Sequence, residues 1–166
     1  MNSKERVYTA LRNEEPDRVP RGENKFDNVF FKGIMGYNTL CYAGWEEMEA
    51  LWAGRRDDVI ADYIDAIPAL AEKLQWDYVR VPPTPKKQDY TGYKRLSERI
   101  YQNAAGKTFN FNPAVGTISM PEKFNTDMTI EELGDPSAEI IVDDSELEIL
   151  RGVIDKIGRT HFIIAH

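Results

Sequence analysis

The stretch from Asp57 to Pro85 constrains the fold more than any other part of the chain. In its first part, apolar side chains recur at gaps of one, three and four residues, which places them on one stripe of a helix. Asp57 or Asp58 is expected to cap this helix, and Pro68 is expected to kink it because proline donates no backbone hydrogen bond. The apolar stripe consists of Val59, Ile60, Tyr63, Ile64, Ile67, Leu70, Ala71 and Leu74.

The period changes after Gln75. Tyr78–Val81 is short, rich in β-branched and aromatic residues, and followed at once by two prolines, which is typical of a strand. A helix that leads directly into a short apolar strand is the repeating unit of α/β proteins. The sequence therefore predicts an α/β fold.

The composition excludes several classes of protein. A chain of 166 residues suits a single domain with a real core. Its net charge of −7 disfavours sequence-independent binding to nucleic acid, whose phosphates an acidic surface repels. Cys41 is the only cysteine, so the chain can form neither an internal disulfide nor a site with two thiolates. No apolar run approaches about eighteen residues, so we expect a cytoplasmic protein without a membrane partner.

Four further segments carry helical patterns. The first helix is expected to start at a Ser3 cap and to bury Val7, Ala10 and Leu11, and the last is expected to end at a left-handed Gly158. Apolar spacing also places Phe30, Phe31, Trp45, Trp52 and Trp76 in the core. The predicted helices cover residues 3–13, 26–34, 45–53 and, from Asp144 or Ser145, residues up to 157.

The remaining strands fall into two groups. Residues 97–111 alternate around a turn at 104–107, which predicts a β-hairpin, and 115–119 can add a strand. A capping box at Thr129–Glu132 predicts a short helix. His161–His166 reads as a second buried strand, and such a strand needs neighbours on both edges. We therefore expect a helical part (1–56), then α/β units (57–166) with a hairpin insertion at about 97–119, whose sheet is completed by further chain or by a partner.

The opening of the chain resembles a known family. Ser3–Val7 and Glu14–Pro20 are similar to the start of the uroporphyrinogen decarboxylase superfamily, which also contains the cobamide-dependent methyltransferases. In that comparison Gln75–Val79 resembles the first barrel strand, and His161–His166 the second. The resemblance implies the N-terminal part of a (β/α)₈ TIM barrel, a fold that needs roughly 250 residues.

Two departures favour the methyltransferase branch of this family. The decarboxylases carry an arginine-rich segment where this chain has Arg21–Asp27, and an aspartate where it has Val81-Pro82. The resemblance thus implies an intact protein that moves a methyl group between a small substrate and a corrinoid held on a partner protein. It also implies a zinc ion whose ligands lie beyond His166. The 166-residue chain alone is expected to be inactive, because most of the strand ends that would build the site are missing from it. The alternatives are a uroporphyrinogen decarboxylase-like lyase and a non-catalytic module that self-associates.

The candidate site residues follow from the barrel, in which strand ends face the active site. Arg80 can bind an anionic group, or pair with a surface acid. His166 can be a ligand or proton carrier, or a frayed terminal residue. The loop Glu23-Asn24-Lys25 is a candidate by family position; Glu23 can act as a general base, or be simply solvated. Cys41 is expected to be an inert thiol.

Overall fold

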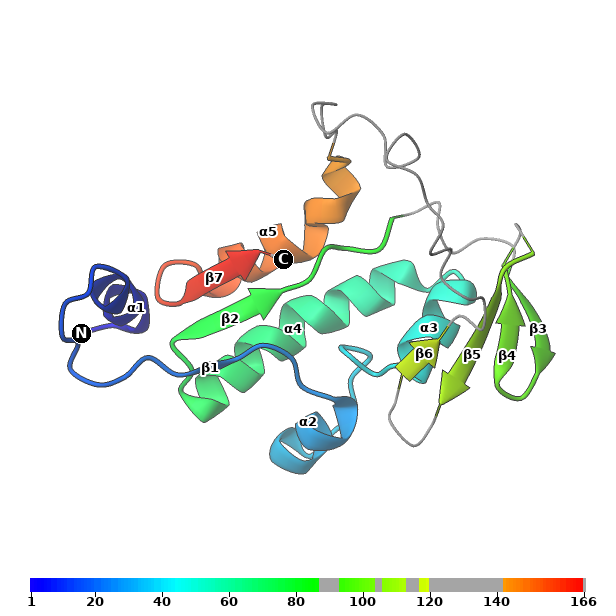
Figure 1. Cartoon of the computed structure of the whole chain (residues 1–166), viewed down its shortest axis with the longest axis horizontal. Helices are drawn as coiled ribbons and strands as arrows, with labels where there is room; N and C mark the ends of the chain where they lie inside the picture. The colour runs from blue at the N-terminus through cyan, green and yellow to red at the C-terminus, as the bar shows by residue number, and fades with distance from the viewer. Residues whose placement is uncertain (87–92, 104–105, 113–116, 120–141, 166) are drawn as a thin grey trace, which may run out of the picture.

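The computed structural model describes residues 1–86, 93–103, 106–112, 117–119 and 142–165, and these form two small open sheets with helices around them (Figure 1). The short helix expected at Thr129–Glu132 and the terminal His166 lie outside the described residues. The mixture of helices and strands agrees with the α/β class. The described residues do not close into a barrel.

A parallel sheet of three strands is the centre of the larger part. Its order is β1 (Gly22–Glu23), β2 (Tyr78–Val81) and β7 (Phe162–Ala165). The strand predicted at 78–81 has the predicted bounds. β1 was not predicted, because it is two residues long and polar, and forms only by pairing with β2. Gly22 permits this pairing, since a Cβ there would lie 2.5 Å from the Tyr78 carbonyl oxygen.

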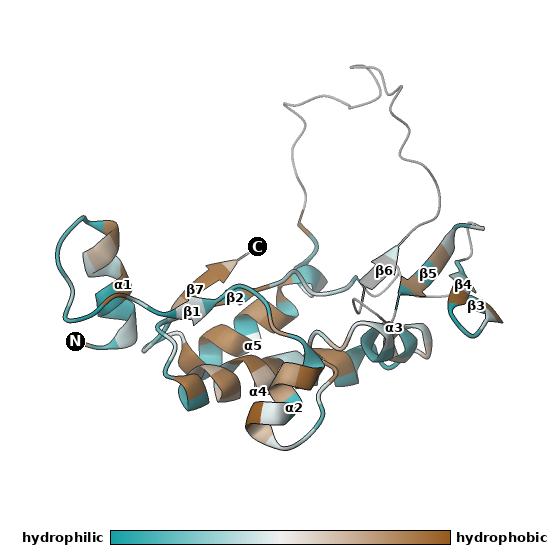
Figure 2. Ribbon diagram, turned by 60° about the horizontal axis from the view of Figure 1, so that its bottom comes forward, coloured by the Kyte–Doolittle hydropathy of each residue, from teal (hydrophilic) through white to brown (hydrophobic). Residues whose placement is uncertain are grey.

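Two helices cover one face of the parallel sheet (Figure 2). These are α4 (Arg56–Leu74) and α5 (Glu148–Ile157), which pack side by side. Alternation along β2 turns Val79 and Val81 into the core, whereas Tyr78 and Arg80 stay partly exposed. The core between the helices and the sheet is built mainly from Val59, Ile67, Leu70, Ala71, Val79, Val81, Ile149, Val153 and Ile157.

Helix α4 differs from the prediction at its start. It begins at Arg56 after Arg55, which makes no side-chain cap, and Asp57 and Asp58 lie in its first turn instead of capping it. The helix continues through Pro68, which is buried. It ends at Gln75, which adopts the left-handed conformation with φ 53°.

The predicted apolar faces of two helices need correction. In α1 (Ser3–Leu11) the cap is Asn2 rather than Ser3, and the helix buries Arg6, Val7 and Thr9 while Leu11 stays 63% exposed. The reason is that α1 packs beside β2 and β7, where Arg6 has an ionic partner. In α2 (Asn28–Met35) only Phe31 is buried, and Phe30 is exposed rather than in the core.

Corrections also apply to the last helix and strand. A 3₁₀ turn (Asp144–Leu147) precedes α5, which buries Ile149 and exposes Ile154. Gly158 is right-handed at φ −64°; it is crowded rather than strained, since a Cβ would lie 2.6 Å from the Ile154 carbonyl oxygen. β7 is not fully buried, because no described element covers the face opposite the helices.

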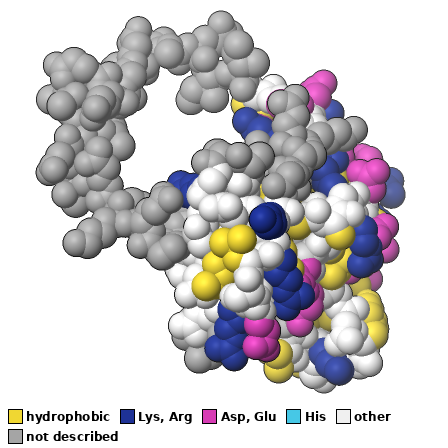
Figure 3. Space-filling model, turned by 90° about the vertical axis from the view of Figure 1, so that its right-hand side faces the viewer, with side chains coloured by type: hydrophobic (Ala, Val, Ile, Leu, Met, Phe, Trp, Pro, Cys, Tyr) yellow, Lys and Arg dark blue, Asp and Glu magenta, His cyan; other side chains and the backbone are white. Residues whose placement is uncertain are grey.

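The second sheet is antiparallel, with β3 (Lys94–Ser97), β4 (Ile100–Gln102), β5 (Thr108–Asn112) and β6 (Thr117–Ser119) in that order. β4 and β5 are the predicted hairpin, and β3 extends the sheet beyond the predicted start at 97. Trp52 stacks on Tyr101 with ring centroids 4.2 Å apart, and Trp45 on Phe111 at 4.9 Å. The two tryptophans of α3 (Trp45–Trp52) therefore join this sheet to the helix instead of filling the main core. Figure 3 faces this end of the molecule, where acidic and basic side chains are interspersed.

A buried ionic cluster fixes the N-terminal segment at the amino end of β2. Asp77, with no exposed surface, accepts hydrogen bonds from Arg6 Nη1 (2.5 Å), Arg18 Nη1 (2.5 Å) and the Arg21 backbone N–H (2.8 Å). Arg6 also binds Asp17 through Nε (2.5 Å) and Nη2 (2.8 Å). Burial acts to raise the pKa of Asp77, but the bonds from Arg18, Arg21 and Arg6 outweigh it and lower that pKa to about 2. The opening residues thus hold α1 to the sheet.

A second set of contacts joins the two ends of the long connection between β2 and α5. The Thr84 backbone N–H donates to the Glu146 carbonyl (2.9 Å), and its Oγ1 accepts from the Ile149 N–H (2.9 Å). The buried Arg56 donates to the carbonyls of Pro85 (2.6 Å) and Ser145 (3.0 Å). Residues 84–85 and 145–149 therefore lie side by side on the start of α4.

Candidate functional site at the carboxyl end of the parallel sheet

The carboxyl ends of β1, β2 and β7 share one edge of the sheet because the three strands are parallel. In open α/β sheets this edge is where ligands bind. Asn24 and Lys25 follow β1, and Arg80 lies one residue before the end of β2. Arg80 Nη1 donates to Asn24 Oδ1 at 2.6 Å. Two of the candidate residues, 56 positions apart in sequence, thus meet at this edge.

The other candidates are arranged less closely. Glu23 is exposed, and its Oε1 accepts from the Asn24 backbone N–H at 2.7 Å, which agrees with the solvated alternative for this carboxylate. The Lys25 ammonium lies 5.5 Å from the centre of the Tyr42 ring, within cation–π range. His166 lies outside the described residues and is not placed at this edge.

A carboxyl–phenol pair beside these residues was not predicted. The Tyr63 hydroxyl, on α4, donates to Glu47 Oε1 on α3 at 2.9 Å, and it accepts from the Tyr42 backbone N–H at 3.2 Å. The sequence did contain a signal: Glu47 stands three and four residues before the buried Ala50 and Leu51, and so shares their helix face. Its partner, by contrast, depends on how two helices pack.

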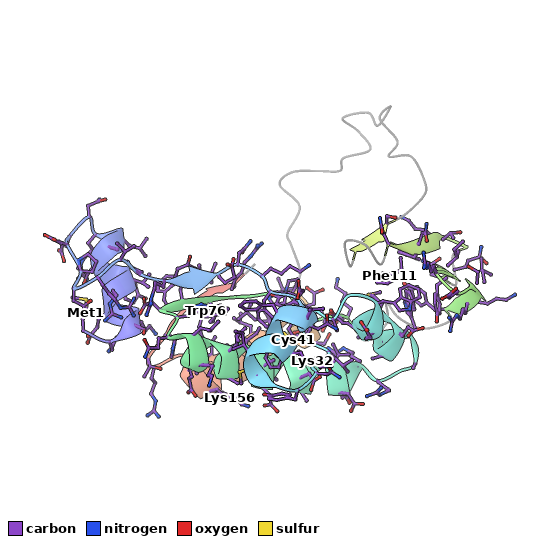
Figure 4. The ribbon with its side chains drawn as sticks, turned by 90° about the horizontal axis from the view of Figure 1, so that it is seen from below. Met1, Lys32, Cys41, Trp76, Phe111 and Lys156 are labelled. Atoms are coloured by element: carbon purple, nitrogen blue, oxygen red, sulfur yellow. The ribbon has the colours of Figure 1, made fainter. Side chains whose placement is uncertain are left out.

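Hydrogen bonds to Asp62 of α4 and within the loop itself hold the loop that carries Tyr42. Asp62 Oδ2, on α4, accepts from the Leu40 N–H at 2.6 Å, and Thr39 Oγ1 accepts from the Cys41 N–H at 3.0 Å. Cys41 is buried where α2, α4 and the parallel sheet meet (Figure 4). An open pocket of about 680 Å³ lies on the outer side of this loop, lined by Asn28, Lys32, Asn38, Thr39, Leu40, Glu46, Arg55, Asp58, Ala61 and Asp62. The hydrogen bonds of the Leu40 and Cys41 N–H groups set the position of Tyr42 at the site.

Burial controls the protonation of this group of residues. It raises the pKa of Glu47 to about 7, against the hydrogen bond from Tyr63 and the positive charge of Lys25, which lower it. Burial also raises the pKa of Tyr42, and the positive charge of Arg80 opposes that change. The pKa of the Cys41 thiol is raised by burial and by the charges of Glu47 and Asp62, so the thiol stays protonated. The site therefore combines a carboxyl group whose pKa is about 7 with the positive charge of Lys25 that acts on it, at the edge that also carries Arg80.

The raised pKa of Glu47 predicts a pH-dependent effect of Glu47→Gln on stability. Folding disfavours the ionised carboxylate of Glu47, so ionisation lowers the free energy of unfolding of the wild type. This loss is absent below the usual pKa of 4.5, grows as the pH rises to about 7, and is constant above that. Urea unfolding should show the variant gaining stability relative to the wild type across this interval, since glutamine can still accept from Tyr63. The exposed Glu46→Gln serves as the control and should show no such trend. The same pH dependence of stability in both variants would contradict the raised pKa of Glu47.

The described residues do not fit a zinc site. Among them, no three His, Cys, Asp or Glu side chains are grouped so that they could hold a metal ion. The protonated, buried Cys41 is also a poor ligand, because zinc binds the thiolate.

Comparisons with known proteins add no relative. No family model matches the chain, and searches of curated proteins and of solved structures gave no significant match. In the described part of the chain, no helix is both long and apolar enough to cross a membrane.

Proposed function

We propose that this chain forms the first units of a (β/α)₈ barrel like that of the uroporphyrinogen decarboxylase superfamily. The protein that contains it would transfer a methyl group between a small substrate and a corrinoid carried by a partner protein. The observation that carries this proposal is the convergence of Arg80, Asn24 and Lys25 at the carboxyl edge of a parallel sheet. In barrels of this type that edge holds the active site.

The topology supports the proposal. β2, α5 and β7 form a β–α–β unit with parallel neighbouring strands, and α4 and α5 both cover the same face of the sheet. In a barrel that face is the outside, so Tyr78 and Arg80 would face the interior. The residues of the opening signature, Arg6, Asp17 and Arg18, all take part in the cluster around Asp77.

Each residue of the edge has a role in this proposal. Arg80 presents a planar guanidinium, which suits an anionic group on the substrate. Asn24 orients Arg80 through its amide oxygen. Lys25 adds a second positive charge. A corrinoid would supply the cobalt that accepts or gives the methyl group, whereas these side chains bind and orient the small substrate.

The position of Asp77 argues against the decarboxylase alternative. That activity calls for a carboxylate at the end of the first barrel strand. Asp77 lies at the opposite end of β2 and is fully engaged by arginines. At the carboxyl end β2 has Val81 and Pro82 instead.

Methyl transfer can be tested directly on the full-length protein that contains this chain, with free cob(I)alamin and a panel of methyl donors. Methylcobalamin should form with at least one donor, and Arg80→Gln should lower kcat/KM by about 10- to 100-fold, the effect of losing one charge-assisted hydrogen bond. Lys94→Gln, on the exposed strand β3, is the control and should retain full activity. Failure with every donor would refute the proposal, and loss of carboxylate from uroporphyrinogen would favour the lyase instead.

The edge of β7 favours a second candidate, a module that associates with another copy of itself. β7 pairs with β2 on one side, no described strand pairs with its other side, and Ile164 is 39% exposed. This candidate predicts a concentration-dependent dimer in analytical ultracentrifugation. A strictly monomeric, cooperatively folded chain would exclude it.

A further inference from the structure

Three groups at the carboxyl edge come from different elements and act on one another. Lys25 follows β1, Arg80 belongs to β2, and Glu47 belongs to α3. Tyr42 interacts with all three groups. Its ring centre lies 5.5 Å from the Lys25 ammonium. Burial raises the pKa of its hydroxyl, and the positive charge of Arg80 acts to lower it. Its backbone N–H donates to the Tyr63 hydroxyl, which in turn donates to the Glu47 carboxyl. An anion bound at Lys25 would therefore act on the same carboxyl group, Glu47, on which the charge of Lys25 acts.

Glu47 also differs from the other acid at this edge. Glu23 is exposed and accepts a hydrogen bond from the neighbouring backbone. Glu47 is partly buried, and the groups around its carboxyl are Tyr63, Tyr42, Cys41 and Lys25. Among these, only Lys25 carries a charge at neutral pH. The ionised form of Glu47 thus depends on one nearby cation and one hydrogen bond.

We propose that the carboxyl edge binds a small organic carboxylate between Lys25 and Arg80, and that Glu47 takes up a proton when this anion binds. The anion would neutralise the charge of Lys25 that favours ionised Glu47, and it would add a negative charge of its own. Both effects favour the protonated carboxyl. A monoanion suits the edge better than a phosphate dianion, since two acids stand beside the two cations. This proposal deepens the site assignment made under the proposed function and does not require methyl transfer.

The raised pKa of Glu47, about 7, places the coupling where it can be measured. By linkage, a rise of one unit in that pKa on binding equals a tenfold weaker affinity for the anion at high pH than at low pH. Other titrating groups at the site, the Tyr42 and Tyr63 hydroxyls and the Cys41 thiol, all have pKa values raised by burial and stay protonated through this range.

The test uses acetate as the probe and acetamide as its uncharged analogue, with the chain labelled with ¹³C at glutamate side-chain carboxyls. The Glu47 resonance, identified by its loss in Glu47→Gln, should titrate near pH 7 and shift upward by about one unit in saturating acetate. Acetate affinity should fall about tenfold between about pH 6 and about pH 9 in the wild type and stay constant in Glu47→Gln. Acetamide should neither shift the Glu47 titration nor show an affinity that changes with pH.

Two variants complete the test. Lys25→Gln should weaken acetate binding at least about fivefold, whereas Lys32→Gln, on the exposed face of α2, should not change it. Tyr63→Phe removes the bond that favours ionised Glu47, so its titration should move further upward without acetate. The proposal is overturned if acetate leaves the Glu47 titration unchanged, or if Lys25→Gln and Lys32→Gln bind acetate equally. If the full-length protein transfers methyl groups but acetate does not shift the Glu47 titration, this inference is refuted and the proposed function is not.

Discussion

Replacing Asp77 with alanine is expected to destabilise the protein by about 3–5 kcal/mol, the usual cost of removing one partner from a buried ionic pair. The carboxylate has no exposed surface, and it is the shared acceptor for Arg6, Arg18 and the Arg21 N–H. Its loss leaves two guanidinium groups without their common counter-ion at the amino end of β2. Urea unfolding at neutral pH, followed by circular dichroism, measures the change.

Asp65→Ala is the matched control for this experiment. Asp65 also pairs with a cation, Lys156, but its side chain is 71% exposed, so we expect a change within about 1 kcal/mol. The difference between wild type and Asp77→Ala should persist down to the usual pKa of 3.8 and shrink as pH falls toward about 2, because the folded-state pKa is lowered. Equal destabilisation by the two substitutions would show that the cluster around Asp77 does not hold α1.

Leu70→Ala is expected to cost about 2–5 kcal/mol, since Leu70 has no exposed surface and lies in the core beneath the sheet. Truncation removes apolar contacts and leaves a cavity that the packed helices α4 and α5 cannot close. Leu11→Ala is the informative comparison, because its spacing predicts a buried side chain and the structure exposes it. It should change the free energy of unfolding by no more than about 0.5 kcal/mol. A large effect at Leu11 would mean that α1 packs against something through its outer face.

The elements that sequence predicts best here are those whose pattern is local and strong. The helix at 57–74 and the strand at 78–81 follow from apolar period and two prolines, and both are present with nearly these bounds. β1 could not be found in this way, because Gly22 and Glu23 are extended only by virtue of the ladder to β2. In α1 the predicted burial of Val7 is confirmed, but that of Leu11 is wrong. The burial of Arg6 could not be predicted from apolar spacing, because it depends on an ionic partner 71 residues away.

The site shows the same division. Family position and strand ends nominated Arg80 and Asn24, and these two side chains do meet. Glu47 was missed because its environment depends on Tyr63, whose pattern marks it only as a core residue of α4. A helix face can be derived from spacing, but the hydroxyl at the far end of a buried ring acquires its partner only from tertiary packing. The tryptophans of α3 illustrate this too, since their spacing is helical but their partners belong to the second sheet.

The contacts of Thr84 and Arg56 have a consequence for how this protein can vary. They bring the residues after β2 and the residues before α5 to the same place on α4. The entropy of closing a loop grows only slowly with its length, and here the two anchor points are bonded to the core independently of what lies between them. Lengthening, shortening or exchanging the intervening segment should therefore cost the parallel sheet little, so this connection can change in length and sequence while the strands and helices that it joins keep their arrangement.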